Sequence, residues 1–94
     1  MNAQEKTLEK LYKSGVGYWQ KGDFINALKF FQPAADNGHI DAQYIVGRMY
    51  YLGEGVTQDY SKAASWFDKA ANQDDAVAQF DLAMLYLILQ RIFI

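Results

Sequence analysis

The side chains that could support hydrolysis are one histidine and three serines. His39 is the only histidine in the 94 residues, and Ser14, Ser61 and Ser65 are the candidate nucleophiles. A serine hydrolase needs a histidine beside the serine and a carboxylate that orients the histidine. His39 is distant in sequence from all three serines, and no HExxH zinc motif occurs. An enzyme is therefore the less favoured hypothesis, and no catalytic residue is assigned.

Two other patterns could indicate a metal or a phosphate site, and each has a simpler structural explanation. Asp74 and Asp75 form an acidic pair without a neighbouring ligand set, so we interpret them as the N-cap of a following helix. Gly53-Glu54-Gly55 lacks the preceding strand and the following Gly-Lys-Ser/Thr of a phosphate-binding loop. We expect no metal and no cofactor.

Composition narrows the function classes further. Hydrophobic residues make up 51% of the chain, which favours a folded core, and the net charge of -2 offers no basic field for nucleic acid. There is no cysteine for disulfides or thiolate metal sites. The longest apolar run, Leu82 to Leu89, is shorter than the ~18 residues of a membrane span, and no secretory signal is recognisable. By exclusion, we expect a cytoplasmic protein.

The chain contains an internal repeat, and the helices of that repeat must position the side chains discussed above. Ala42-Gln43-Tyr44 matches Ala78-Gln79-Phe80 at a separation of 36 residues. Further pairs at the same separation are Tyr50 and Tyr86, Ala63 and Ala27, Trp66 and Phe30, Phe67 and Phe31, and Asp59 and Asp23. A period of this length is typical of helix pairs stacked into a solenoid.

Within each unit the apolar residues recur at steps of three and four, which predicts helices. The expected helices are about Gln4–Lys21, Asp23–Asp36, Ile40–Leu52, Tyr60–Gln73 and Ala76–Arg91. We expect Asp23 and Asp59 as N-caps. Gly22 and Gly53 follow helices and favour left-handed backbone there.

The second unit resembles the Sel1-like repeat family, which is related to the tetratricopeptide repeats. The matching residues are Ala42, Gly47, Tyr50, Gly53, Gly55-Val56, Asp59, Lys62-Ala63, Trp66 and Lys69-Ala70-Ala71. The first unit is more similar to a plain tetratricopeptide repeat, through Gly15, Tyr18, Gly22-Asp23-Phe24, Ala27, Phe31 and Ala34. The third unit supplies a first helix alone, with Ala78, Ala83 and Tyr86.

The resemblance implies an all-α superhelix of about five antiparallel helices in a single domain over residues 1–94. Its units would be repeat 1 at about 4–38, repeat 2 at about 39–75 and a half repeat at about 76–94. Pro33 departs from the pattern by removing a helical N–H, so we expect a kink there. Leu89 replaces a loop glycine, and no second helix follows in the third unit.

In such solenoids the first helices of the units line a concave groove, and the resemblance carries that groove onto this chain. The implied partner-binding residues are Glu9, Tyr12, Val16, Trp19, Gln20, Asp41, Tyr44, Arg48 and Tyr51, continued in the third unit by Phe80, Met84, Leu87 and Ile88. Exposed Tyr, Trp and Arg are the side chains that commonly anchor interfaces. An alternative remains for Tyr44, Phe80 and Trp19, which could instead pack against a neighbouring helix.

Other aromatic residues occupy framework positions and are expected in the core. They are Tyr18, Tyr50, Tyr86, Phe24, Tyr60, Phe31 and Phe67, and Trp66 is expected to be buried against flanking helices.

The leading hypothesis is a non-catalytic scaffold that binds a peptide or a helix of a partner protein. Family resemblance implies adaptor roles in signalling or assembly, often in bacteria. The alternative is a self-assembling homodimer, because the apolar last helix has no second helix to cover it. Its self-association residues would be Met84, Leu87, Ile88, Ile92 and Phe93. A fragment of a longer repeat protein is a further alternative.

Overall fold

The structure is a computed structural model that describes residues 1–93, and the side chains of residues 1–91. It is all-α, with no strand within that range, which confirms the predicted fold class. The helices are α1 (Ala3–Gln20), α2 (Phe24–Asp36), α3 (Ile40–Leu52), α4 (Tyr60–Ala71) and α5 (Ala76–Phe93). Each bound lies within two residues of the bound expected from the sequence.

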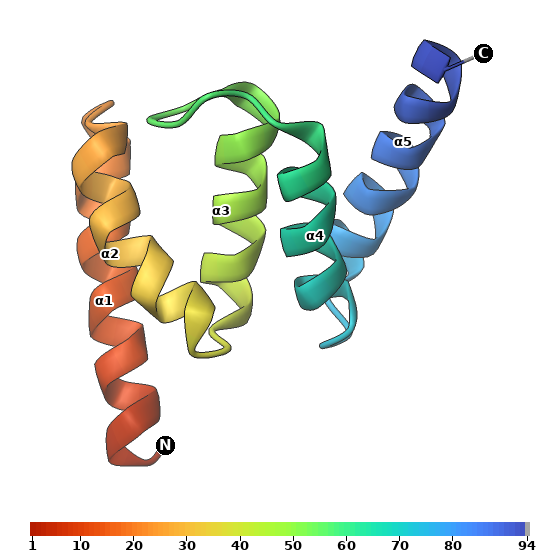
Figure 1. Cartoon of the computed structure of the whole chain (residues 1–94). Helices are drawn as coiled ribbons and strands as arrows, with labels where there is room; N and C mark the ends of the chain where they lie inside the picture. Colours follow the sequence, from red (N-terminus) through yellow and green to blue (C-terminus); the bar gives the residue numbers. More distant parts are fainter. Residues whose placement is uncertain (94) are drawn as a thin grey trace.

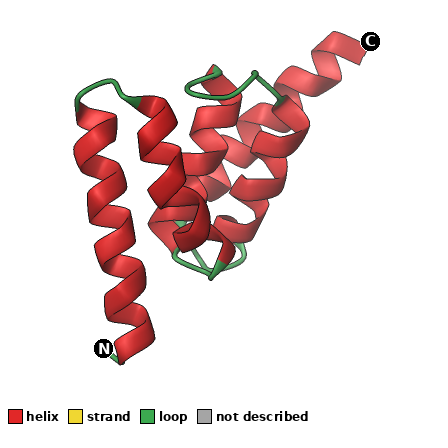
Figure 2. Ribbon diagram, turned by 60° about the vertical axis from the view of Figure 1, so that its left-hand side comes forward, coloured by secondary structure: helices red, strands yellow, loops and turns green. Residues whose placement is uncertain are grey.

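The helices pack in chain order, each against the next, into a curved slab that measures 47 × 28 × 17 Å (Figure 1). Helix α1 lies against α2, α3 lies between α2 and α4, and α5 packs against α4. The last turns of α5 project beyond the other helices (Figure 2). The arrangement is the stacked helix pairs of a solenoid, with α1, α3 and α5 as successive first helices.

The helix starts repeat the same hydrogen bonds along the chain. The carboxylates of Asp23 and Asp59 accept from the N–H groups of Asn26 and Lys62, which confirms both as N-caps. His39 caps α3, where its Nδ1 accepts from Ala42 N–H at 3.1 Å. Asp75 stands 36 residues later and caps α5 in the same way, since its Oδ1 accepts from Ala78 N–H at 3.0 Å. The acidic pair at the start of α5 thus includes a helix cap.

Within a helix pair, a glycine on the first helix receives an aromatic ring from the second. A Cβ at Gly15 would lie 2.6 Å from the Phe31 ring, and one at Gly47 would lie 2.7 Å from the Phe67 ring. Phe31 is fully buried and Phe67 is 3% exposed. The close approach of the two helices therefore depends on the missing side chain of each glycine.

Two glutamines connect successive repeats at the period of 36. The side-chain amide of Gln43 donates to the Ala35 carbonyl at 3.2 Å, and that of Gln79 donates to the Ala71 carbonyl at 3.2 Å. Gln73 in turn donates to the side-chain carbonyl of Gln43 at 2.7 Å. Gln43 is only 6% exposed, so these bonds satisfy a buried amide between repeats.

Two framework tyrosines are not in the core, contrary to expectation. Tyr18 is 36% exposed and stacks on Phe30 with ring centres 5.5 Å apart, and Tyr86 is 51% exposed. Tyr50, the equivalent residue of the central unit, packs against both core clusters. Within the described residues, Tyr50 stands in a helix with a packed neighbour on either side, whereas Tyr18 stands in the first helix and Tyr86 in the last.

Two other expectations need qualification. Trp66 is partly buried rather than buried: it packs against the larger core cluster, and its outer face carries the Lys69 ammonium 4.1 Å from the ring centre. Pro33 lies inside α2, which continues to Asp36 and bends in its second half (Figure 1). The bend agrees with the expected kink, because Pro33 cannot donate to the Lys29 carbonyl.

Candidate functional site

A pocket of about 250 Å³ lies where α3 meets α5, the first helices of two successive repeats. Its lining residues are Tyr44, Arg48, Tyr51, Leu52, Phe67, Asp81, Met84, Leu85 and Ile88. Five of these, Tyr44, Arg48, Tyr51, Met84 and Ile88, stand among the residues expected from the sequence to face a groove. We call this cavity the α3–α5 pocket.

A hydrogen bond across the two helices fixes one side of the pocket. The Tyr44 hydroxyl donates to Asp81 Oδ2 at 2.7 Å, and its ring lies 5.6 Å from the ring of Phe67. Burial, followed by the bond to the negative Asp81 carboxylate, raises the pKa of Tyr44 to about 12. Tyr44 therefore remains a neutral donor at physiological pH. It packs against neighbouring helices, as its alternative interpretation held, and it also lines the pocket.

Arg48 joins the pocket to the first repeat. Its guanidinium carbon lies 5.7 Å from the centre of the Trp19 ring, a cation–π contact between α3 and α1. Arg48 is exposed, and Trp19 is partly buried against the core with its indole nitrogen buried and unbonded. Within the described residues, no carboxylate lies within ion-pair distance of Arg48.

The other α1 residues of the expected groove lie elsewhere. Val16 and Tyr12 pack against the core cluster, and Tyr12 stacks on His39 with ring centres 4.7 Å apart. Burial, and then the charges of Asp41 and Glu9, raise the pKa of Tyr12. Gln20 is exposed and does not line the α3–α5 pocket. The structure thus leaves Trp19 as the α1 residue that approaches the pocket through Arg48.

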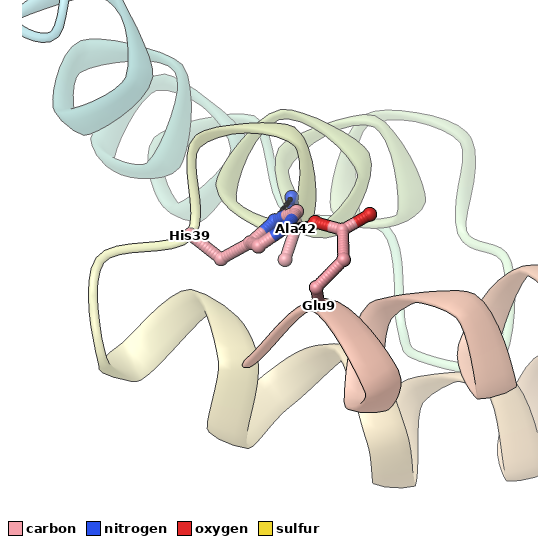
Figure 3. Close-up of polar contacts among 3 residues, drawn as sticks. All are labelled: Glu9, His39 and Ala42. Carbon is pink, nitrogen blue, oxygen red and sulfur yellow. Dashed lines mark hydrogen bonds and ion pairs between the residues drawn. The ribbon is translucent and has the colours of Figure 1, made fainter. Parts of the chain in front are cut away.

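Glu9 and Asp41 line a different cavity, of about 660 Å³, at the turns that precede α3 and α5. Here Glu9 Oε2 lies 2.8 Å from His39 Nε2 (Figure 3). Because His39 Nδ1 accepts from the Ala42 N–H, the proton of the neutral ring sits on Nε2 and is donated to Glu9. Both ring nitrogens of His39 are engaged, since Nδ1 caps α3 and Nε2 bonds to Glu9 of α1, and neither bonds to a serine.

Several apolar side chains of α5 are exposed in the described part of the chain. Phe80 is 65% exposed, Met84 44% and Leu87 55%, whereas Ile88 is partly buried beside the α3–α5 pocket. The exposure of Phe80 excludes its alternative interpretation as a packed residue. The side chains of Ile92 and Phe93, expected to take part in self-association, lie outside the described part of the chain.

Sequence reasoning missed four pocket residues: Leu52, Phe67, Asp81 and Leu85. Phe67 and Leu85 were hidden because they also belong to the core, where they are 3% and 1% exposed. Asp81 carried a signal that could have been used. It stands 36 residues after the buried Ile45, so a charged residue occupies a framework position in the third unit.

Within residues 1–93, no group of three or more His, Cys, Asp or Glu side chains is arranged to hold a metal ion. No helix in that range is both long and apolar enough to cross a membrane.

Comparison with known proteins gives matches along nearly the whole chain. The sequence profile of the Sel1 repeat matches residues 10–39, 40–75 and 76–90. The ERAD-associated E3 ubiquitin-protein ligase component HRD3B of Arabidopsis thaliana is 32% identical over 82% of this chain and 13% of its own length.

Two further relatives come from a bacterium and a yeast. An exopolysaccharide production negative regulator of Rhizobium leguminosarum is 32% identical over 67% of this chain and 24% of its own length. Chitin synthase regulatory factor 3 of Schizosaccharomyces pombe is 35% identical over 69% of this chain and 7% of its own length. The chain thus spans less than a quarter of each of these three relatives, whose sources extend well beyond bacteria. The match to all three units, together with the close approach of glycine and aromatic ring within both complete helix pairs, shows that the chain belongs to the Sel1 repeat family.

Proposed function

We propose that this chain is a non-catalytic interaction scaffold that holds a peptide or a helix of a partner protein at the α3–α5 pocket. The observation that supports this most is the convergence of Tyr44, Arg48 and Tyr51 with Met84 and Ile88 on one cavity. These residues come from two repeats, and they combine aromatic rings, an arginine and apolar side chains, which is the composition of interface anchors.

The size of the pocket favours a side chain over a metabolite. Its volume of about 250 Å³ is below the ~300–1,000 Å³ that small-molecule sites usually occupy. A cavity of this size accepts one or two side chains of a partner, while the rest of the partner lies along α3 and α5. Relatives named as a ligase component, a negative regulator and a regulatory factor are consistent with a protein that acts through other proteins.

A peptide-binding experiment tests the proposal. Purified protein is panned against a phage-displayed library of random dodecapeptides, and enriched peptides are measured by fluorescence anisotropy. Met84→Glu places a charge at the edge of the apolar pocket, and we expect affinity to fall by at least about tenfold. Gln90→Glu, on the same helix but outside the pocket, is the charge-matched control and should bind as the unchanged protein does. If Met84→Glu binds the peptides as tightly as the unchanged protein does, the α3–α5 pocket is not where they bind.

A second candidate function is self-association through α5, and the apolar side chains exposed on that helix favour it. The exposed apolar side chains are Val77, Phe80, Met84, Tyr86 and Leu87. Ala83 is also exposed and stands 36 residues after Gly47, the residue that receives the Phe67 ring in the second repeat. A two-fold axis at Ala83 would place a second α5 antiparallel to the first, as a following helix would run, with Phe80 opposite the second copy's Tyr86.

Sedimentation equilibrium over a range of concentrations tests this second function. The unchanged protein should show a dimer that Tyr86→Glu converts to a monomer, because each buried aromatic pair would then face a charge. Gln4→Glu, near the start of α1, adds the same charge away from α5 and should leave the dimer intact. A monomer at the highest concentration in the unchanged protein would exclude this function without affecting the α3–α5 pocket.

A further inference from the structure

The rim of the α3–α5 pocket carries a positive charge that has no ion-pair partner among the described residues. The Arg48 guanidinium is exposed and has no carboxylate within 4.0 Å in the described part of the chain. The carboxylate of the pocket, Asp81, already accepts a hydrogen bond from the Tyr44 hydroxyl at 2.7 Å. One oxygen of Asp81 is thus used within the chain, whereas all the N–H groups of the Arg48 guanidinium are open to a partner.

The contact between Arg48 and Trp19 holds this charge in place without using its hydrogen-bond donors. A guanidinium has five N–H donors, and attraction to an aromatic face consumes none of them. The ring lies 5.7 Å from the guanidinium carbon and belongs to α1, so residues of two helices contribute to the position of Arg48. A planar, partly ordered guanidinium is well suited to a carboxylate, which accepts two of its N–H groups side by side.

The inner part of the pocket has the opposite character. Phe67 and Leu85 line it and are 3% and 1% exposed, so its interior is continuous with the core. Met84 and Leu52 also line it and are 44% and 48% exposed, which leaves apolar surface in contact with water. Filling this space with an apolar side chain removes that surface from water and adds contacts with the core residues.

We propose that the partner segment inserts a large apolar side chain into the α3–α5 pocket and pairs an Asp or Glu carboxylate with Arg48. This inference rests on the proposed binding function and specifies its ligand as an acidic–apolar peptide. On a helical partner the two side chains would stand three or four residues apart, on one face. The chain as a whole carries a net charge of -2, which disfavours acidic peptides at long range. A preference for acid would therefore originate locally, at Arg48.

The experiment compares matched peptides on matched variants. The probes are enriched dodecapeptides that contain an apolar anchor, each synthesised with Glu, Gln or Lys at its enriched acidic position. On the unchanged protein we expect the Glu peptide to bind about five times more tightly than the Gln peptide, as suits an exposed ion pair. Arg48→Gln should abolish this difference, and Arg48→Glu should reverse the order of the Glu and Lys peptides. Lys13→Gln, which removes a positive charge from the exposed face of α1, should preserve the difference.

The outcomes separate the inference from the function beneath it. Suppose that apolar peptides bind and that Met84→Glu weakens their binding, but that the Glu and Gln peptides bind equally well. The proposed binding at the α3–α5 pocket is then supported, and the preference for an acidic partner is wrong. Enrichment of Lys or Arg beside the apolar residue would also overturn the inference, since it would make Asp81 the charge that selects partners. If no peptide is enriched, or if Met84→Glu has no effect, the proposed function itself fails. Circular dichroism of each variant confirms that the helices remain folded.

Discussion

At the scale of single residues, two glycines of the first helices, Gly15 and Gly47, allow an aromatic ring of the second helix to approach closely. Gly47 meets the Phe67 ring and the Cβ of Trp66, whereas Gly17, also in a first helix, has no heavy atom within 4 Å of an added Cβ. The two positions therefore provide a natural comparison between glycine required by packing and glycine that is merely tolerated.

Gly47→Ala should destabilise the protein, while Gly17→Ala should stabilise it. In a helix interior, alanine gains up to about 1 kcal/mol over glycine. At Gly47 the added Cβ would lie 2.7 Å from the ring, and overpacking of this kind costs about 1–3 kcal/mol. We expect a net loss of about 1–2 kcal/mol for Gly47→Ala. Urea denaturation of both variants measures this, and equal effects would show that the ring adjusts freely.

The hydrogen bond between Tyr44 and Asp81 should be visible in an alkaline titration. Burial and the neighbouring carboxylate raise the pKa of Tyr44 from 10.0 to about 12 in the folded protein. The neutral form is thus favoured by folding, so its contribution to stability is complete below pH 10 and is lost as the pH rises toward 12. Absorbance of tyrosinate should show a late step that Tyr44→Phe removes. If Tyr44→Phe removes an ordinary step near pH 10 instead, the bond to Asp81 does not form.

At the scale of elements, the first helices α3 and α5 begin at caps that stand 36 residues apart, the period of the repeat. His39 and Asp75 are different chemically, but both place an acceptor at the N–H of the third residue that follows them. The position, rather than the residue type, is what repeats. This explains why the lone histidine belongs to the architecture of the helix pairs.

Asp75→Ala should weaken α5 and, with it, one side of the α3–α5 pocket. Removal of the acceptor leaves the Ala78 N–H without its partner and typically costs about 1 kcal/mol. Asp75→Asn keeps an acceptor oxygen and should lose only a small part of that stability. Hydrogen exchange of the α5 amides, measured for both variants, distinguishes them. If the α5 amides exchange as fast in Asp75→Asn as in Asp75→Ala, the loss of the negative charge, and not the loss of the acceptor, explains the weakening of α5.

The sequence predicted the helices well because each has a local signal. The caps Asp23 and Asp59, the glycines that follow helices, and the apolar period place the bounds within two residues. The exposure of Tyr18 and Tyr86 was not predictable from the repeat. Both match Tyr50 by position in the unit, but the helices packed around each of the three tyrosines differ. Burial in a solenoid depends on the neighbouring unit, and a repeat alignment does not contain that information.

The lining of the α3–α5 pocket includes most of the groove residues expected on α3 and some of those expected on α5, but none of those expected on α1. Tyr44, Arg48 and Tyr51 follow one helix face, and that face lines the pocket as their spacing requires. Tyr12 and Glu9 obey the same spacing, yet His39 engages both of them, Tyr12 through stacking and Glu9 through a hydrogen bond. A contact between residues 30 positions apart, such as Glu9 with His39, has no periodic signature in the sequence.

At the scale of the whole molecule, the helix pairs form a continuous array whose connections recur from one repeat to the next. The bond of Gln43 to Ala35 is repeated by that of Gln79 to Ala71, so α5 is set on α4 in the same way as α3 is set on α2. The α3–α5 pocket lies between consecutive first helices of this array. Its shape therefore depends on the repeat-to-repeat register rather than on any single loop.

The most direct test of the central claim is an amide chemical-shift map of the protein upon addition of an enriched apolar–acidic peptide. If α3 and α5 hold the partner, the largest changes should fall on Arg48, Tyr51, Asp81, Met84 and Leu85, with smaller changes at Trp19. The amides of α2 should remain where they are. Changes confined to the outer face of α5, at Phe80 and Leu87, or to the cavity beside His39, with none at Arg48, would contradict the account.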